Sequence, residues 1–207
     1  MGAALTSGVL AVGAAFAFAA ALAVPAPVVR AVEPGTPVAA DDASRPAECR
    51  VEPIALPLAL PPAATSTAVL PDPDALPAGE VADDATVAGV TATVRESIAC
   101  RNAGDLRRAY ALMTPALLAG LLGGPETAPP EIVRLLLEPP DRVPTDERVA
   151  LVAVSDVALL PDGRVRARVE TDAAGFRFAD LLLFARDAQG GRWLIDDALP
   201  LKRQPLP

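Results

Sequence analysis

The spacing of the apolar residues changes at Glu147, and this change constrains the fold more than any other feature of the 207-residue chain. From Asp83 to Glu138, apolar residues recur three or four positions apart, which is the spacing of one helix face. From Arg148 onward they alternate with polar residues, as in a strand with one buried face. Helices followed by strands predict an α+β domain in which helices cover an antiparallel sheet.

Capping residues predict where the first helices begin and end. An aspartate at position 83 or 84 can accept the free amide hydrogens of a first helix that runs to about Asn102. Gly104 can take the left-handed conformation that ends this helix, and Asp105 can cap a second one. The buried side of the second helix is expected to carry Leu106, Ala109, Tyr110 and Met113. Proline-bounded helices are expected at 115–122 and 131–138.

Two hairpins are expected in the second half of the domain, with strands at 148–160, 164–171, 176–186 and 192–199. The loop Pro161-Asp162-Gly163 joins the first two strands, with its glycine in the left-handed position. This loop length pairs Leu159 with Val165, Val157 with Ala167 and Asp156 with Arg168. The expected sheet is a four-stranded meander that curves around the helices.

The first 82 residues differ in composition from the rest. No charged side chain precedes Arg30, and Ala3–Val24 is an apolar run. These features predict an export signal at 1–31, or alternatively an N-terminal membrane anchor with the domain outside. Twelve prolines between Pro25 and Pro77 mark a Pro/Ala-rich leader at 32–82, expected to be largely extended or disordered. The domain at 83–201 and a tail at 202–207 follow, in a secreted or extracytoplasmic protein.

Cys49 and Cys100 are the two cysteines of the chain. An even number of cysteines in an exported protein favours a disulfide. Cys100 is expected on a flank of the first helix, away from its buried stripe, where the leader can reach it. A Cys49–Cys100 disulfide would attach the leader to the domain, and two free thiols are the alternative. The stretch Cys49–Pro62 carries apolar residues at near-alternate positions and is expected to dock as an extended segment.

Charge and composition exclude several classes of function. The net charge is −8, and residues 83–207 hold 18 acidic and 15 basic side chains, so the domain is nearly neutral. A neutral domain with five aromatic residues lacks the basic footprint and stacking platforms of a nucleic-acid binder. The chain has no histidine, and two cysteines alone supply too few ligands for a zinc site. We therefore expect no nucleic acid, no metal and no cofactor.

The stretches VTATVRESIACRNAGDLRRAYALMTP and GGRWLIDD resemble the nuclear-transport-factor-two-like superfamily, which includes ketosteroid isomerase, scytalone dehydratase and polyketide cyclases. The resemblance covers Asp83 to about Leu201, and it is strongest to exported, uncharacterised bacterial members with a Pro/Ala-rich leader. It implies a cone-shaped α+β fold with a pocket between the concave face of the sheet and the helices. Members of the superfamily include enzymes, ligand binders and association modules, so the resemblance does not choose an activity.

The candidate pocket residues are Tyr110, Arg101, Phe178, Asp180 and Trp193. Tyr110 is the sole phenol and falls on the buried stripe of its helix. Asp180 shares a strand face with Phe178; if that face is the concave one, burial raises the pKa of Asp180 and makes it a candidate general base. The opposite face of the same strand is also apolar, so the sequence leaves both orientations open. Arg101 can reach water, pair with Asp105 or bind a ligand carboxylate.

These features favour an exported, non-enzymatic binding or association module. Its partner would be a small apolar ligand in the cone, or a protein or second copy bound through the sheet. The alternative is an isomerase or lyase of the ketosteroid-isomerase kind, with Asp180 as base and Tyr110 as hydrogen-bond donor. Catalysis requires these two side chains to face each other across a cavity. A purely structural dimer module would instead expose a large apolar outer sheet face.

Overall fold

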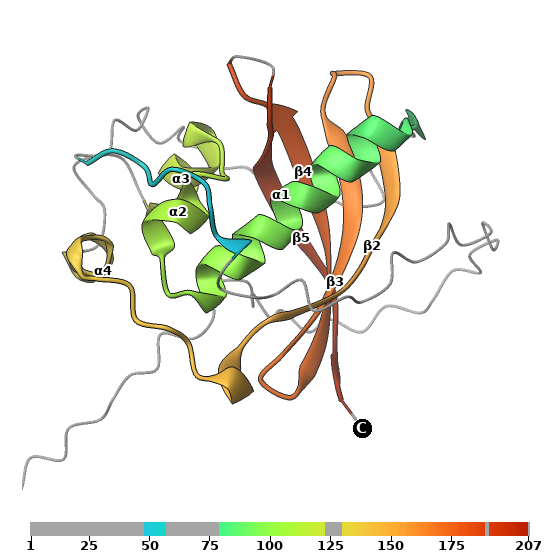
Figure 1. Cartoon of the computed structure of the whole chain (residues 1–207). Coiled ribbons are helices and arrows are strands. Elements are labelled where there is room, and N and C mark those ends of the chain that lie inside the picture. The colour runs from blue at the N-terminus through green and yellow to red at the C-terminus, as the bar shows by residue number, and fades with distance from the viewer. Residues whose placement is uncertain (1–47, 57–78, 123–129, 189–190, 207) are drawn as a thin grey trace, which may run out of the picture. The chain divides into compact units, whose positions relative to one another are not determined.

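The computed structural model describes residues 48–56, 79–122, 130–188 and 191–206, which form an α+β domain (Figure 1). One long helix lies across a face of a five-stranded antiparallel sheet, and the shorter helices gather beside its C-terminal half. The expected α+β class is therefore confirmed. The predicted export signal or anchor and most of the predicted leader lie outside the described residues.

The helices begin and end close to the expected positions, except that the second helix stops at Tyr110 and leaves Met113 in the following turn. They are α1 (Asp84–Asn102), α2 (Leu106–Tyr110), α3 (Pro115–Leu122) and α4 (Pro130–Leu137), followed by the 3-10 turn η3 (Thr145–Glu147). Asp83 accepts a hydrogen bond from the Thr86 amide at 2.7 Å and so caps α1. Thr114 caps α3 by accepting from the Leu117 amide. These caps fix the helix starts because they satisfy amide hydrogens that have no partner inside the helix.

The strands follow chain order across the sheet, and every neighbouring pair is antiparallel. They are β1 (Glu80–Val81), β2 (Ala150–Leu159), β3 (Val165–Ala173), β4 (Phe176–Arg186) and β5 (Trp193–Pro205). The sequence did not indicate β1, a two-residue strand that pairs with the end of β2. The last strand is also longer than expected and continues to Pro205. An edge strand tolerates its prolines because one side of it has no neighbour that needs an amide hydrogen.

The first hairpin has the expected turn but only part of the expected register. Gly163 has φ +85°, and Leu159 pairs with Val165 as predicted. The other two predicted pairs are wrong, because β2 bulges between Ser155 and Ala158. Asp156 takes φ +53° in this bulge, and Ser155 rather than Asp156 lies opposite Arg168. A bulge adds residues to one strand and shifts all pairs beyond it.

One face of the sheet, which we call the inner face, lies against α1. Trp193 touches α1 at Gly89, where an added Cβ would lie 2.8 Å from the indole ring. Directly paired residues of antiparallel strands point to the same side of the sheet, so the register extends this face from β5 to β3. The inner face consists of Val165, Ala167, Val169, Thr171, Phe178, Asp180, Leu182, Phe184, Trp193 and Ile195. Val165 and Phe184 are fully buried there.

The outer face of the sheet carries apolar residues at its centre and charged residues around them. Leu181 pairs with Arg168 and Leu199, and Leu183 pairs with Arg166. The three leucines are buried. Both registers of β4 are therefore apolar and buried at the centre of the sheet, which is why the sequence pattern could not assign its two faces.

Candidate functional site

The strand register places Asp180 on the inner face. Asp180 pairs with Val169 on β3 and with Pro200 on β5, and it points to the same side as Leu182 and Phe184. Its side chain is half-buried, with apolar neighbours on both adjoining strands. Of the two orientations that the sequence allowed, the structure therefore has the one in which this carboxyl group faces the helices.

Arg101 approaches the same region from α1. It follows Val90, Val94 and Ser97 at intervals of four, three and four residues, so it continues the stripe of α1 that packs on the sheet. Burial lowers the pKa of Arg101, while its interactions with Tyr110 and Asp180 oppose that shift. A guanidinium group remains charged at neutral pH even so. The last turn of α1 therefore brings a positive charge to the inner face.

Burial raises the pKa of Asp180 to about 6, and the positive charge of Arg101 opposes this rise. Burial also raises the pKa of Tyr110, again against Arg101, so the phenol stays protonated and able to donate a hydrogen bond at neutral pH. Arg101, Tyr110 and Asp180 thus form one electrostatically coupled group, which we call the inner cluster. It combines two hydrogen-bond donors with a carboxyl group whose pKa is raised to about 6, a combination suited to holding a polar ligand group or moving a proton.

The elbow between α1 and α2 positions two members of the inner cluster. Asn102 is 1 % exposed, and its side-chain amide donates to the Val149 carbonyl oxygen and accepts from the Val149 amide. Gly104 has φ +73°, and a Cβ on it would lie 1.8 Å from the carbonyl oxygen of Asp141. Asp105 caps α2 through the Arg108 amide. The Asn-Ala-Gly-Asp sequence is therefore a structural turn that sets Arg101 and Tyr110 on adjoining helices.

Phe178 lies two residues from Asp180 on the inner face and belongs to an aromatic group at the end of the sheet. The rings of Phe176 and Phe178 have centroids 6.3 Å apart. The guanidinium of Arg203 lies 3.7 Å from the Phe176 centroid and 5.5 Å from that of Phe178. Arg203 is not among the predicted site residues because the sequence pattern ends the last strand at Leu199. Uninterrupted alternation from the Arg186–Trp193 pair would have placed Leu201 opposite Phe178, and two register shifts between β4 and β5 bring Arg203 there instead.

Trp193 is on the inner face but distant from the inner cluster. It pairs with Arg186, six residues along β4 from Asp180, which corresponds to roughly 20 Å of extended strand. Its ring packs on Gly89 and lies 4.0 Å from the guanidinium carbon of Arg186. Arg101 thus interacts with both Tyr110 and Asp180, and Phe178 lies two residues from Asp180 on the same face. The fifth candidate, Trp193, lies at the other end of the sheet.

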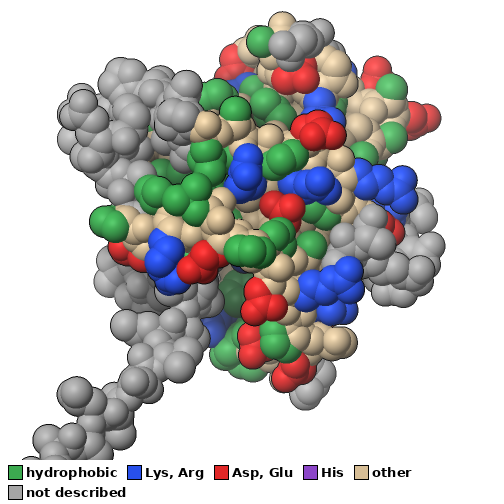
Figure 2. Space-filling model, turned by 60° about the vertical axis from the view of Figure 1, so that its left-hand side comes forward, with side chains coloured by type: hydrophobic (Ala, Val, Ile, Leu, Met, Phe, Trp, Pro, Cys, Tyr) green, Lys and Arg blue, Asp and Glu red, His purple; other side chains and the backbone are tan. Residues whose placement is uncertain are grey.

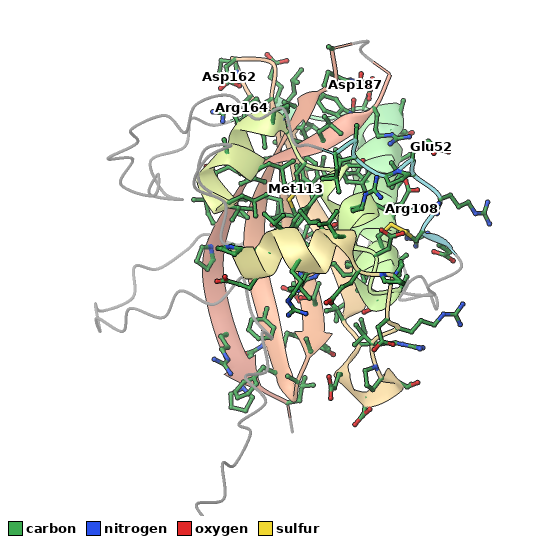
Figure 3. The ribbon with its side chains drawn as sticks, turned by 90° about the vertical axis from the view of Figure 1, so that its left-hand side faces the viewer. Glu52, Arg108, Met113, Asp162, Arg164 and Asp187 are labelled. Atoms are coloured by element: carbon green, nitrogen blue, oxygen red, sulfur yellow. A yellow bond between two sulfur atoms is a disulfide. The ribbon has the colours of Figure 1, made fainter. Side chains whose placement is uncertain are left out.

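The predicted disulfide between Cys49 and Cys100 is present. Their Cα atoms are 4.6 Å apart, and the bond lies next to Arg108 (Figure 3). Cys100 is 0 % exposed, because the segment Glu48–Leu56 covers the flank of α1 that the sequence suggested was open. This segment docks without becoming a strand, and the rest of Cys49–Pro62 lies outside the described residues.

Two kinds of feature are absent from the described residues, a metal site and a membrane-spanning helix. No group of three or more Cys, Asp or Glu side chains in these residues could hold a metal ion. None of the helices in the same residues is both long and apolar enough to cross a membrane. On the face shown in Figure 2, basic and acidic side chains are interspersed and form no single-sign surface. Comparisons with protein-family models, with curated proteins and with solved structures gave no match.

Proposed function

We propose that this protein is an exported, non-enzymatic binding module of the nuclear-transport-factor-two-like kind. It would hold a small, mainly apolar ligand between the inner face of its sheet and the C-terminal end of α1. The single observation that carries this proposal is the inner cluster, in which Arg101 interacts electrostatically with both Tyr110 and Asp180 at a mainly apolar part of the inner face. Ligand sites commonly combine an apolar lining with a few polar groups that orient the ligand.

The chemistry of the inner cluster suggests which part of the ligand it would contact. Arg101 and Tyr110 supply hydrogen-bond donors, so they would bind a carbonyl, carboxylate or sulfonate oxygen. Phe178, two residues from Asp180, would contact the apolar body of the ligand. The disulfide supports the proposed extracytoplasmic location, because disulfides persist in oxidising compartments. Binding of a protein or second copy through the outer face has less support, since its central leucines are buried.

A fluorescent probe with an apolar body and one anionic group tests the proposal. We expect anilinonaphthalene sulfonate to bind the folded, oxidised protein saturably. Tyr110→Phe removes one donor and should weaken binding about fivefold, and Arg101→Gln removes a charged donor and should weaken it about tenfold or more. Arg166→Gln, on the outer face, is the matched control and should leave binding unchanged. Non-saturable binding, or equal losses in all three variants, would count against a site at the inner cluster.

A second candidate function is proton transfer by an isomerase or lyase of the ketosteroid-isomerase kind. The specific observation in its favour is that burial raises the pKa of Asp180 to about 6, which suits a general base near neutral pH. Tyr110 and Arg101 would then stabilise the negative charge that develops on a carbonyl oxygen.

Solvent hydrogen exchange in a small β,γ-unsaturated cyclic ketone tests this second function. If Asp180 is the base, the protein should accelerate exchange at the carbon next to the carbonyl, with a rate that rises with pH through about 6. Asp180→Asn should abolish the acceleration while leaving saturable probe binding in place. A protein that binds the probe but gives no acceleration is a binding module only.

A further inference from the structure

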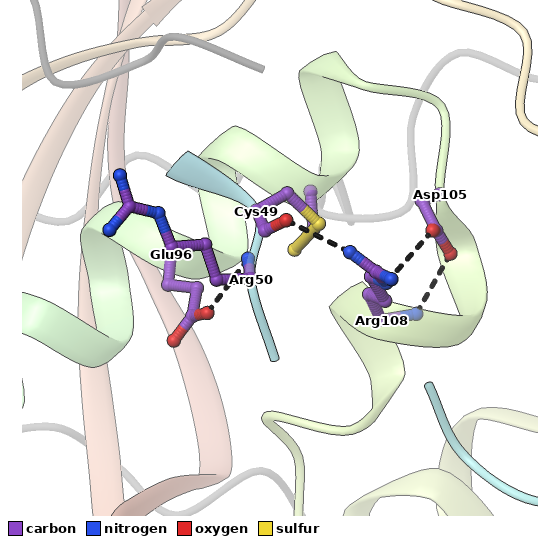
Figure 4. Close-up of a disulfide and its surroundings, with 6 residues drawn as sticks. Cys49, Arg50, Glu96, Asp105 and Arg108 are labelled. Carbon is purple, nitrogen blue, oxygen red and sulfur yellow. Dashed lines mark hydrogen bonds and ion pairs between the residues drawn. A yellow bond between two sulfur atoms is a disulfide. The ribbon is translucent and has the colours of Figure 1, made fainter. Parts of the chain in front are cut away.

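The segment Glu48–Leu56, which we call the strap, binds to the side of the α1–α2 elbow that carries Cys100. Besides the disulfide, Arg108 donates to the Cys49 carbonyl oxygen at 3.1 Å, and the Arg50 amide donates to Glu96 (Figure 4). Arg107 donates through Nε and an Nη to the Ile54 carbonyl oxygen, and its own carbonyl accepts from the Ile54 amide. The strap is thus held at both of its ends by α1 and α2.

The strap also completes a small core on that side of the elbow. Val51 is buried together with Cys100, Ala109 and Leu112, and Cys49 packs against them. This core is separate from the apolar inner face of the sheet. Without the strap, Cys100, Ala109 and Leu112 would become exposed to solvent on this side.

The residues that the strap holds are the chain neighbours of the inner cluster. Cys100 bonds to the strap and Arg101 follows it, and Ala109 packs under the strap and Tyr110 follows it. Successive helix residues point about 100° apart, so one side of the elbow faces the strap while another carries Arg101 and Tyr110, and Arg101 interacts with Asp180. Any movement of the strap therefore acts on the two backbone positions that aim Arg101 and Tyr110.

α2 depends on such external contacts. It has five residues, and helices this short are not stable on their own in water. Asp105 caps its start, and two of its five residues, Arg107 and Arg108, bind the backbone of the strap. The position of Tyr110 at the end of α2 is thus set partly by a segment that lies more than fifty residues earlier in the chain.

We propose that the strap and the Cys49–Cys100 disulfide are the positioning element of the inner cluster, so that the cluster takes its observed arrangement only in the oxidised protein. Bond formation removes two protons and two electrons from the two thiols and passes the electrons to a protein disulfide, which becomes a dithiol. The site would accordingly mature only after exposure to an oxidising compartment. The role of the inner cluster as a ligand site rests on the proposed function. The coupling between the disulfide and the inner cluster can be measured without any ligand.

The chain offers two built-in reporters for the test, because it contains one tyrosine and one tryptophan. Tyr110 belongs to the inner cluster and Trp193 lies at the opposite end of the sheet. The full chain is compared before and after reduction, and with the variant Cys49→Ala/Cys100→Ala, by phenolate absorbance and by tryptophan emission. We expect the pKa of Tyr110 to fall toward that of an exposed phenol when the disulfide is absent, while Trp193 emission stays the same.

Two results would overturn the proposal. One is that Tyr110 titrates alike in oxidised and reduced protein. The other is that both reporters change together, because the disulfide would then stabilise the whole domain rather than this elbow.

Two valine truncations test the contribution of the strap with the disulfide intact. Val51→Ala should shift the pKa of Tyr110 in the same direction as reduction, but by less. Val165→Ala, an equal truncation away from the strap, should give no shift, and equal shifts in the two variants would also contradict the coupling.

The test separates this inference from the proposed function. A shift of Tyr110 on reduction, without saturable binding of anilinonaphthalene sulfonate to the oxidised protein, leaves the coupling standing and removes the proposed function. Saturable probe binding that is the same in oxidised and reduced protein supports the proposed function and removes the coupling. If both hold, reduction should weaken probe binding about as much as Arg101→Gln does.

Discussion

The two ends of α1 meet the sheet in different ways. Near the N-terminus, Gly89 lets the indole of Trp193 lie against the helix, and Thr93 donates to the Trp193 carbonyl oxygen at 2.8 Å. Near the C-terminus, the last turn of the same helix carries Arg101, which interacts with Tyr110 and Asp180. The first end packs an aromatic ring on a glycine, although the indole N–H is buried there without a hydrogen-bond partner among the described residues. The other end gathers charged groups and a phenol, whose burial is unfavourable. Such a contrast within one helix indicates where function is to be sought.

The largest effect is expected at the turn that follows the polar end. Gly104→Ala should destabilise the fold by about 5 kcal/mol or more, because alanine is strained at a positive φ and its Cβ would collide with the backbone of Asp141. Urea unfolding of the purified variant measures the loss. Gly120→Ala in α3 is the matched control, since a Cβ there meets nothing within 4 Å and should stabilise by about 0.5–1 kcal/mol. Similar effects at both glycines would contradict this account of the elbow.

An intermediate effect is expected in the apolar core of the inner face. Phe184 is 0 % exposed, and Phe184→Ala should lower the free energy of unfolding by about 3–4 kcal/mol through lost burial and a residual cavity. The same truncation at Phe178, which is half-buried at the other end of β4, should cost clearly less. Chemical denaturation of both variants gives the comparison. A larger loss at Phe178 would mean that the cluster end is the better packed of the two.

The smallest effect is expected at Asp180, and it should have the opposite sign. Its pKa is raised by burial from 3.8 to about 6, so between these values the folded protein keeps a proton that the unfolded chain has lost. This contribution to stability is fully present below about pH 4 and is lost as the pH rises through about 6. Asp180→Asn should remove this pH dependence and stabilise the fold at pH 7 by about 1 kcal/mol, a figure reduced for partial exposure.

Thermal unfolding between pH 4 and pH 7 measures the Asp180 effect. Asp146→Asn, on the exposed turn η3, is the control for removing a carboxylate elsewhere. An unchanged slope in Asp180→Asn would show that this carboxyl group is not responsible for the pH dependence.

Local signals predicted the local structure well. The cap at Asp83, the left-handed turn at Gly104 and the hairpin at Gly163 each depend on one residue type whose backbone preference is strong. The bulge was not predictable, because aspartate at φ +53° in β2 is held by the pairing of its neighbours rather than by its own preference. β1 was missed because two residues carry no periodicity.

The candidate site was predictable as a set of residues but not as an arrangement. Asp180, Tyr110 and Arg101 stood out as single polar residues in apolar patterns. The direction of Asp180 depends on which face of β4 meets α1, and both faces read as apolar. The same limit applies to Cys100: helix geometry placed it on an open flank, and only the strap, from a distant part of the chain, buries it.

The composition of β5 affects how copies of this protein can associate. A strand from another molecule that aligned against this edge would meet no amide hydrogen at Pro200 or Pro205 and would have to desolvate Lys202 between them. At the other end of β5, Ile195 already exchanges hydrogen bonds with the backbone of Leu112 and Thr114. Continuation of the sheet into a neighbouring copy, the first step toward fibrillar aggregation, is therefore disfavoured along this border.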